Sequence, residues 1–234
     1  MSQACIQLSN VEFCWSNNQP SLFNIESLTL RKAEKLFIHG PSGCGKTTLL
    51  NLISGVLTPS CGEILVLGNN LFSQKQNFRD QFRADHMGII FQQFNLIPYL
   101  SVLENITLPC IFSWRRREML SIQKRSTIEE ALRLLAALGL NDKNIIHKNV
   151  TELSTGQQQR VAAARALIGS PEIIIADEPT SALDQDAKQG FLELLFEEVQ
   201  KSNSALLFVS HDLTLSNLFD RSVSLNDFRS MENA

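Results

Sequence analysis

The 234-residue sequence predicts an α/β fold, and three observations support this class. Short apolar runs at residues 35–39, 173–176 and 205–210 have the composition of parallel strands buried on both faces. A glycine-rich turn follows the first run and leads into a helical pattern. Residues 92–153 carry apolar residues at helical spacing instead. We therefore expect one folded unit with two lobes, because α/β folds of this size are commonly single domains.

The N-terminal residues 5–39 predict strands that are joined by turns. Apolar and polar residues alternate in the first of them, which suits a strand with one buried face. The alternation runs through Ile6, Leu8, Val11 and Phe13. Trp15 follows near the end of this strand, either as an ordinary half-buried aromatic or as a platform for a base. Residues 62–68, with a glycine at each end, predict another short strand.

The turn after residues 35–39 fits the phosphate-binding pattern G-x-x-x-x-G-K-[ST]. It consists of Gly40, Pro41, Ser42, Gly43, Cys44, Gly45, Lys46, Thr47 and Thr48. Its glycines let N–H groups surround phosphate oxygens, and the helix 47–53, with Gly55 as its stop, adds partial positive charge. Lys46 is placed to reach the β- and γ-phosphates, and the Thr47 hydroxyl to ligate Mg²⁺. A chance match in this strand–loop–helix setting is the weaker alternative.

The apolar run that begins at Ile173 ends in two acids, Asp177 and Glu178. At the C-terminal end of a buried parallel strand, these acids would emerge in the crevice where open α/β sheets bind ligands. Asp177 is then placed to hold Mg²⁺, and Glu178 to orient and deprotonate the attacking water. A strand that simply ends at a solvated acidic turn is the alternative, which the phosphate loop in the same chain disfavours.

Residues 92–153 predict helices. Ser101 is placed to cap a helix that ends near Pro109, and a longer helix runs over residues 127–138. Between these helices lies the basic run Trp114–Arg117, which is interpreted as a solvated face. A contact with a membrane partner or with anionic headgroups is the alternative for this run.

A second glycine-bearing turn, residues 153–160, opens another helix well downstream of the phosphate loop. Ser154 and Gln157 have the spacing of a capping box, which needs no nucleotide. The same cap leaves helix N–H groups facing outward, where an anion could bind. The turn is therefore a candidate contact for a phosphate. That phosphate would be bound by a different part of the site or by a different chain.

Three other polar residues stand next to predicted elements. Gln92 is either a polar loop residue or a ligand, and Gln93 beside it leaves the register open. Asp184 is placed as the N-cap of an amphipathic helix over residues 185–201. A lone histidine such as His211 is more often structural than functional, but its position directly after an apolar strand favours a functional role.

With these residues in hand, the chain resembles the nucleotide-binding subunits of ATP-binding-cassette (ABC) transporters, from about Ile6 to Leu225. The motifs that carry the resemblance are, in chain order, Trp15, Gly40–Thr48, Gln92, Leu153–Gln157, Asp177–Glu178, Ser181–Asp184 and His211. The Phe-Gln-Gln-Phe-Asn-Leu stretch and the glutamine-rich signature Leu153–Gln157 are most similar to the lipoprotein-release and macrolide-export branch.

The resemblance implies ATP hydrolysis in a head-to-tail homodimer, with ATP and Mg²⁺ as cofactors. Trp15 would stack on adenine, and Asp184 would lie in a loop that crosses the dimer. The catalytic residues would be Lys46, Gln92, Glu178 and His211. The metal ligands would be Thr47, Gln92 and Asp177. The residues that contact the γ-phosphate from the opposite chain would be Ser154, Thr155, Gly156 and Gln157.

The resemblance also implies a P-loop NTPase core with a mixed or parallel sheet, an N-terminal antiparallel β layer and an inserted α-helical subdomain. We expect a single ABC ATPase domain over residues 1–234, with a RecA-like core over about 1–92 and 160–234 and a helical subdomain over about 93–159. In the family this subdomain grips an integral membrane permease subunit. The expected location is therefore cytoplasmic, at the inner face of the cell membrane.

Two residues need separate comment. Thr155 stands where the family usually has glycine, so it stiffens the turn, although its hydroxyl offers a further hydrogen bond. Cys44 lies inside the phosphate loop, where a small residue that the loop tolerates is the simpler interpretation. The alternative is a reactive thiol whose pKa the helix N-terminus lowers.

Composition disfavours several other classes of protein. The net charge is −3 with both signs dispersed, so we expect no nucleic-acid partner. Five cysteines without a Cys-x-x-Cys pattern indicate neither a disulfide framework nor a zinc site. The apolar runs fall short of the ~20 residues that span a bilayer. The start, Met1 to Ala4, lacks the basic and apolar regions of a secretory signal.

The expected function is ATP binding and hydrolysis that power export, or extraction of a lipoprotein or other substrate, through a membrane ABC transporter. A mechanical ATPase that drives a non-transporting membrane complex is the first alternative. A chromosome-maintenance ABC ATPase is less favoured, because no long heptad array lies between Gln92 and Leu153. A small-molecule P-loop kinase would leave the signature and His211 without a role.

Overall fold

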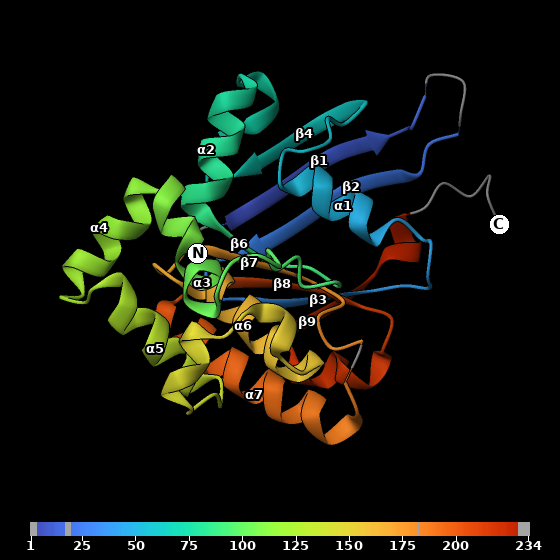
Figure 1. The fold of residues 1–234 in the computed structure, drawn as a ribbon. Helices are drawn as coiled ribbons and strands as arrows, with labels where there is room; N and C mark the ends of the chain where they lie inside the picture. The colour runs from blue at the N-terminus through green and yellow to red at the C-terminus, as the bar shows by residue number, and fades with distance from the viewer. Residues whose placement is uncertain (1–3, 17–19, 182, 229–234) are drawn as a thin grey trace. The chain divides into compact units, whose positions relative to one another are not determined.

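The computed structural model describes residues 4–16, 20–181 and 183–228 (Figure 1). The chain divides into two compact units: residues up to 80 together with those from 205 onward form unit one, and residues 81–204 form unit two. Part of the predicted N-terminus, Met1 to Gln3, and one residue of the predicted cross-dimer loop, Ala182, lie outside the described residues.

Unit one contains an antiparallel sheet with the strand order β2-β1-β4-β5. Its strands are β1 (Ala4–Phe13), β2 (Phe23–Arg31), β4 (Cys61–Val66) and β5 (Asn69–Asn70). In Figure 1, β1 runs between β2 and β4, and the pairing brings apolar residues opposite one another, such as Leu8 and Leu28. These side chains are buried, which confirms the predicted alternation in β1 and the predicted antiparallel layer.

Unit one also contains three parallel strands, with β3 (Lys35–His39) paired to both β8 (Ala205–Ser210) and β9 (Arg221–Ser224). Phe37 of β3 lies opposite Phe208 of β8, with their ring centroids 6.1 Å apart. Both strands are apolar throughout their centres, as strands buried on both faces must be. Helix α1 (Lys46–Ile53) follows β3 after the phosphate loop.

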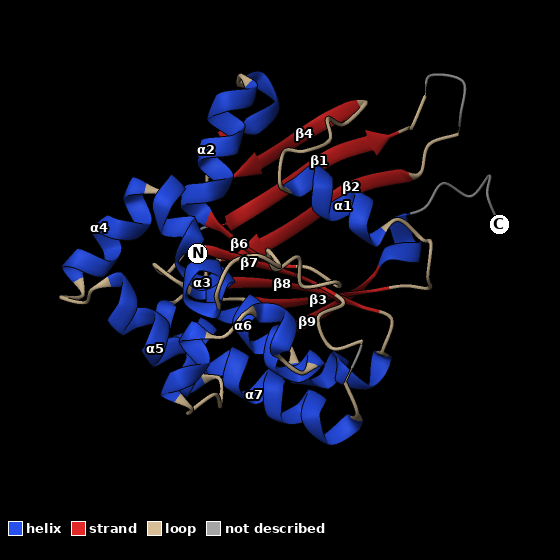
Figure 2. Cartoon of the chain, in the orientation of Figure 1, coloured by secondary structure: helices blue, strands red, loops and turns tan. Residues whose placement is uncertain are grey.

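Unit two pairs β6 (Met87–Ile90) in parallel with β7 (Ile173–Asp177) and holds most of the helices (Figure 2). The helices are α3 (Val102–Phe112), α4 (Trp114–Ile122), α5 (Thr127–Ala137), α6 (Thr155–Leu167) and α7 (Gln185–Ser202). Helix α2 (Gln76–His86) spans the boundary between the units. Within unit two, α6 packs against α3, α5, α7 and β6. Gly88 permits the last contact, because a Cβ there would collide with the Ala166 carbonyl.

The antiparallel sheet, the parallel strands and the helices together confirm the predicted α/β class. The helix predicted over residues 127–138 is α5, with Leu138 as its C-cap. The predicted end of the first helix near Pro109 is wrong, since α3 continues to Phe112. A proline removes one backbone donor, and the helix continues beyond it because Ser113 N donates to the Pro109 carbonyl at 3.0 Å. Helices α2 and α4 were not predicted.

Candidate functional site

The phosphate loop joins β3 to α1 in unit one, as predicted. Two of its glycines have left-handed backbones, with φ of +78° at Gly43 and +102° at Gly45. These conformations suit glycine, because a side chain there would be strained. Gly45 is also the N-cap of α1, and a Cβ there would lie 2.6 Å from the ring of Phe23. The loop therefore depends on glycine for its shape as well as for the approach of a ligand.

The basic and hydroxyl side chains of the loop have different environments. The Nζ atom of Lys46 donates to the carbonyl oxygens of Gly40 and Pro41, each at 2.9 Å, so the ammonium lies against the loop backbone. Thr47 is exposed on the first turn of α1. Cys44 is buried and would touch any side chain added at Gly40. Its burial favours the interpretation of Cys44 as a small packed residue over that of an accessible thiol.

Two more predicted residues lie in unit one. Trp15 is 61% exposed and contacts Phe13 edge-on, with ring centroids 5.1 Å apart. It is therefore not the half-buried aromatic of the alternative interpretation, and most of its indole surface is open to a ligand. His211 is exposed directly after β8. Asp212 next to it is the N-cap of the short 3-10 helix Leu213–Leu218.

The predicted acids lie in unit two. Asp177 ends β7 and Glu178 follows it, and both side chains are less than one-tenth exposed. Glu178 has a φ of +45°, a left-handed conformation that is uncommon for a residue other than glycine. Its carbonyl accepts a hydrogen bond from Ser181 N at 3.2 Å. A strained backbone at this position is typical of functional sites, where surrounding structure must hold the residue in place.

Gln92 and Gln93 are both exposed in a turn that follows β6. The turn is closed by a hydrogen bond of 2.9 Å from Phe94 N to the Phe91 carbonyl. Phe94 itself is buried, so it anchors the turn while the two amides point to solvent. Either glutamine is thus accessible to a ligand, and the assignment of Gln92 rests on the family motif.

The signature forms the start of α6. Ser154 is the N-cap, and its Oγ accepts from Gln157 N at 3.4 Å while Gln157 Oε1 accepts from Ser154 N at 3.0 Å. The predicted capping box is confirmed. Gly156 has no left-handed backbone, and an added Cβ would meet only Leu183, at an ordinary 3.8 Å. Neither conformation nor packing within the described part of the chain explains why this position is glycine.

Asp184 is the N-cap of α7, as predicted, and its Oδ1 accepts from Ala187 N at 2.8 Å. The helix begins at Gln185 and ends at Ser202, one residue beyond the predicted end. Asp184 itself is exposed, so capping leaves part of the carboxylate accessible.

The interpretation of Trp114–Arg117 as a solvated face holds for Trp114 and Arg117, which are exposed, but it is wrong for Arg116. Arg116 is only 2% exposed, and burial lowers the pKa of its guanidinium to about 10, which leaves it charged at neutral pH. Its nitrogens donate to four backbone carbonyls, those of Ala84 (2.7 Å), Met87 (2.7 Å), Ala166 (3.3 Å) and Ile168 (2.6 Å). Gly169 lets the side chain pass, because a Cβ there would lie 2.5 Å from Arg116 Cβ. Arg116 thus joins α4 to the end of α6 and to the α2–β6 connection.

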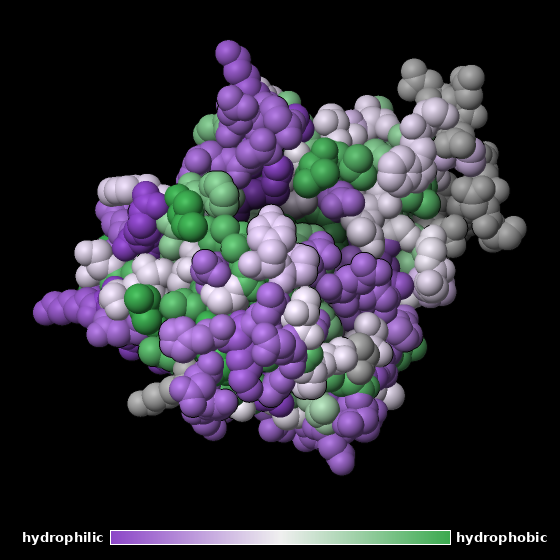
Figure 3. Space-filling model, in the orientation of Figure 1, coloured by the Kyte–Doolittle hydropathy of each residue, from purple (hydrophilic) through white to green (hydrophobic). Residues whose placement is uncertain are grey.

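Apolar side chains on the molecular surface form separate groups among hydrophilic ones (Figure 3). Several of the large ones belong to the end of α3 and to α4. These are Ile111, Phe112, Trp114 and Ile122, each more than 60% exposed. This surface is part of the segment for which a membrane partner was predicted, and that contact stays a prediction.

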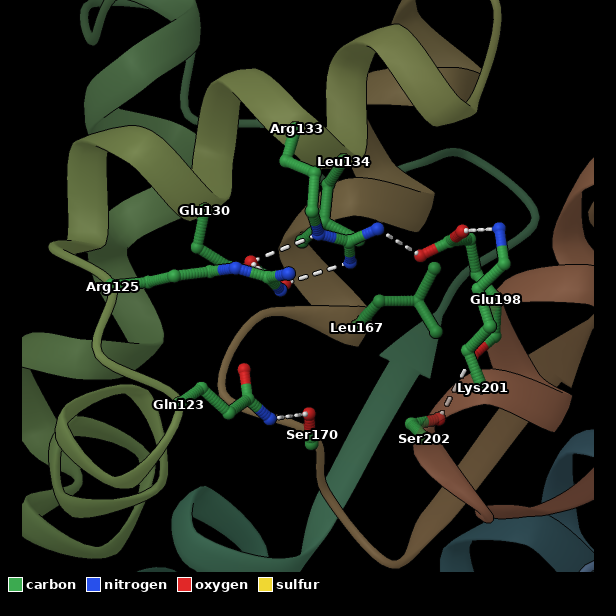
Figure 4. Close-up of a pocket in the computed structure, with 10 residues that line it drawn as sticks. All are labelled: Gln123, Arg125, Glu130, Arg133, Leu134, Leu167, Ser170, Glu198, Lys201 and Ser202. Atoms are coloured by element: carbon green, nitrogen blue, oxygen red, sulfur yellow. Dashed lines mark hydrogen bonds and ion pairs between the residues drawn. The ribbon is translucent and has the colours of Figure 1, made fainter.

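A cavity of about 430 Å³ lies in unit two among α5, α7 and the end of α6, and none of the predicted site residues lines it (Figure 4). Arg133 sits between two buried carboxylates, binding Glu130 through Nε and Nη2 and Glu198 through Nη1 at 2.7 Å. Arg125 and Lys201 pair with the same two acids, at 2.9 and 2.7 Å. The charges in the cavity therefore satisfy one another and tie α5 to α7.

The predicted Mg²⁺ ligands are a hydroxyl, an amide and a carboxylate, on Thr47, Gln92 and Asp177. Oxygen donors of this kind suit Mg²⁺, which is usually held by one or two carboxylates together with water and substrate phosphates. The described residues contain no cluster of three or more His, Cys, Asp or Glu side chains that could hold a metal alone. Within the same residues, no helix is long and apolar enough to cross a membrane.

A glycine-dependent loop between a strand and a helix, with an acid pair at the end of another parallel strand, defines a P-loop nucleotide-binding protein. The sequence matches the ABC transporter family over residues 23–181. The chain therefore belongs to the ABC transporter family, and its ATP-binding motifs are those of an ABC ATPase.

Individual relatives agree with this assignment. The lipoprotein-releasing system ATP-binding protein LolD of Hydrogenovibrio crunogenus is 37% identical, covering 97% of this chain and 96% of LolD. The macrolide export ATP-binding/permease protein MacB of Pasteurella multocida is 33% identical over 97% of this chain, which spans 34% of MacB. The cassette MJ0796 of Methanocaldococcus jannaschii, solved as a dimer in a post-hydrolysis state with ADP and Pi, has a TM-score of 0.80 at 32% identity. That match covers 96% of this chain and 94% of the solved one.

Proposed function

We propose that this chain hydrolyses Mg²⁺-ATP to power a membrane ABC transporter of the lipoprotein-release or macrolide-export type. Lys46 and Thr47 hold phosphate and metal, and Asp177 and Gln92 complete the metal shell. Glu178 activates the attacking water, His211 steadies the γ-phosphate, and Trp15 stacks on adenine. The bound Mg²⁺ would supply charge neutralisation at the phosphates. The buried acids, the exposed indole and the shape of the loop support these roles. The division into a RecA-like core and a helical subdomain stays a prediction.

We infer further that the active form is a head-to-tail homodimer in which the signature of one chain completes the site of the other. The observation that carries this inference is Gly156. The capping box already satisfies the N–H groups of Ser154 and Gln157, whereas those of Thr155 and Gly156 begin α6 without a partner inside the helix. The fold does not require glycine at position 156, and the N–H groups beside it point outward. Such a position is suited to the close approach of a phosphate from outside the chain.

The permease and the location are part of the same proposal. LolD and MacB are named for lipoprotein release and macrolide export, and MacB carries its permease in the same polypeptide. We propose that an integral membrane subunit binds this chain on its cytoplasmic side and uses the ATP-driven closing of the dimer. The exposed apolar residues of α3 and α4 are suited to such a contact.

The test uses the Glu178→Gln variant with and without ATP, and light scattering to measure mass. We expect turnover to fall about a hundredfold or more, because the general base is lost, while ATP converts the variant from monomer to dimer. Glu193→Gln, on the exposed face of α7, is the matched control and should behave as wild type. Adding Gly156→Asp to Glu178→Gln should abolish the dimer without unfolding the chain. A Glu178→Gln protein that stays monomeric in saturating ATP would contradict the proposal.

A further inference from the structure

The turn that carries Gln92 is held from two sides within unit two. On one side, Asn105 of α3 is fully buried, and its Oδ1 accepts from Ile97 N at 2.7 Å while its Nδ2 donates to the Ile97 carbonyl at 3.1 Å. On the other side, Arg165 of α6 donates from Nη2 to the Phe94 carbonyl and from Nη1 to the Asn95 carbonyl, both at 2.6 Å. The second anchor lies closer in sequence to Gln92.

The backbone at the second anchor is unusual. Phe94 and Asn95 are consecutive left-handed residues, with φ of +59° and +48°, and neither is glycine. Such a conformation persists only where surrounding contacts hold it. Asn95 N donates to the Gln93 carbonyl at 2.6 Å, so the chain reverses sharply here. The guanidinium of Arg165 binds both carbonyls of this strained segment and is the contact best placed to hold it.

Arginine is chemically suited to this contact. Its planar guanidinium presents two Nη donors at a fixed spacing, which matches two neighbouring carbonyl oxygens, whereas lysine offers one nitrogen. Arg165 is partly buried, and the desolvation that comes with burial lowers the pKa of its guanidinium. Its hydrogen bonds to the turn thus offset the desolvation of its charge.

We propose that Arg165 is a positioning residue that fixes the turn of Gln92 and ties it to the helix that begins with the signature. Arg165 lies ten positions after Thr155 on the same continuous helix, α6. The inference rests on the proposed function, in which Gln92 is a metal ligand. Arg165 touches neither nucleotide nor metal in this scheme, and it acts through the position of the turn.

The chain offers a matched control. Arg160 lies on the same helix, is also partly buried, and donates to a backbone carbonyl, that of Leu138 at the end of α5. Arg165→Lys and Arg160→Lys therefore make the same chemical change on α6, but only the first removes a contact with the turn. Both variants keep the positive charge and the aliphatic stem, so both are expected to fold.

The first measurement is hydrogen exchange at single-amide resolution in the nucleotide-free protein. In Arg165→Lys, we expect the amides of Phe94 and Asn95 to exchange about tenfold faster or more, while the amide of Ile97, held by Asn105, keeps its wild-type rate. Arg160→Lys should leave all three rates unchanged. Unchanged rates at Phe94 and Asn95 in Arg165→Lys, or equal effects of the two variants, would overturn the proposal.

The second measurement separates metal use from nucleotide binding. Loss of a residue that orients a metal ligand weakens metal affinity or activity about 10-fold to 100-fold. We expect Arg165→Lys to need about tenfold more Mg²⁺ for half-maximal turnover, with Mg²⁺-free ATP binding within about twofold of wild type, and Arg160→Lys to need no more than wild type. If Arg165→Lys needs no more Mg²⁺ than the wild-type protein, the proposed role of Arg165 is refuted. The proposed function is not affected by that result, provided that the wild-type protein hydrolyses ATP.

Two further outcomes remain decisive. If the wild-type protein fails to hydrolyse ATP, the proposed function fails, but the exchange rates of the nucleotide-free protein still decide whether Arg165 holds the turn. If Arg165→Lys does not fold, the wild-type side chain is measured instead. Slow rotation of its guanidinium, seen as separate Nη resonances by NMR, is the expected result, and a freely rotating guanidinium would contradict the clamp.

Discussion

Arg116 should be one of the residues on which the stability of this protein most depends, although it lies in an Arg-Arg-Arg sequence that suggests a surface. The decisive change is Arg116→Met, which keeps an unbranched apolar stem and removes the guanidinium. The variant leaves the carbonyls of Ala84, Met87, Ala166 and Ile168 without the donor that each has in the native protein. These carbonyls come from the α2–β6 connection and the end of α6, so the loss loosens both segments and α4, which carries Arg116.

The magnitude follows from this geometry. Each buried acceptor that loses its partner costs about 1–3 kcal/mol, so the gross loss for the four carbonyls is at least about 4 kcal/mol. Part of this loss is returned, because methionine does not require a charge to be desolvated, and the lowered pKa of Arg116 shows that this desolvation is substantial. We expect a net loss of about 3–5 kcal/mol in the free energy of unfolding, the range for removing one partner of a buried charged contact.

Urea unfolding, followed by circular dichroism, measures this loss. The matched control is Arg115→Met, the neighbouring residue, which is about one-third exposed and pairs with the similarly exposed Glu172. A surface pair of this kind contributes at most about 1 kcal/mol, so Arg115→Met should unfold close to wild type. A loss below about 1 kcal/mol in Arg116→Met, or equal losses in the two variants, would refute the reasoning.

Two other predictions concern the signature and the response to acid. Thr155→Gly should leave ATP turnover equal or higher, because glycine removes bulk beside the γ-phosphate, and a collapse of turnover in a steady-state assay would instead show that the Thr155 hydroxyl is a specialised contact. Burial alone would raise the pKa of Glu198, but hydrogen bonds from Lys201 and Arg133 outweigh burial and hold it below 4.5. A carboxyl whose pKa is lower in the folded than in the unfolded protein stabilises the fold at pH values above its unfolded pKa. It loses this contribution as the pH falls through its folded pKa. Glu198→Gln should therefore have a lower melting temperature than wild type near neutral pH, and its melting temperature should fall less than that of wild type below about pH 4.5. Differential scanning calorimetry measures both temperatures, and an equal dependence of melting temperature on pH in the two proteins would contradict this assignment.

The elements that the sequence predicted are those whose signals are local. The strand β3, the phosphate loop and α1 follow from a contiguous pattern, and the caps at Ser154 and Asp184 follow from residues three or fewer positions apart. Helix α4 has a local cap, because Ser113 Oγ accepts from Arg116 N at 3.0 Å, but neither α2 nor α4 has a strong apolar pattern. Their sequences are dominated by polar residues, and each buries only one apolar side chain, Phe82 in α2 and Leu120 in α4.

The unpredicted parts of the site depend on contacts between distant segments. The role of Arg116 requires the carbonyls of Ala84 and Ile168 to converge, which no window of the sequence reveals. The clamp by Arg165 requires a left-handed backbone at Phe94. Asparagine at position 95 is a weak signal for such a conformation, and phenylalanine gives none. A basic run inside a helical segment was therefore assigned to solvent, as such runs usually are.

The composition of α6 explains why arginines, rather than large apolar side chains, fix its position. Its buried face consists mainly of alanines, which let α3, α5, α7 and β6 approach closely but offer few protrusions that resist sliding. Three guanidinium groups supply that resistance: Arg160 binds the end of α5, Arg165 binds the turn after β6, and Arg116 binds the carbonyls where α6 ends. A slide of one residue moves the helix about 1.5 Å, enough to break all three contacts. The signature at the start of α6 can therefore shift only if its neighbouring helices and the turn of Gln92 move with it.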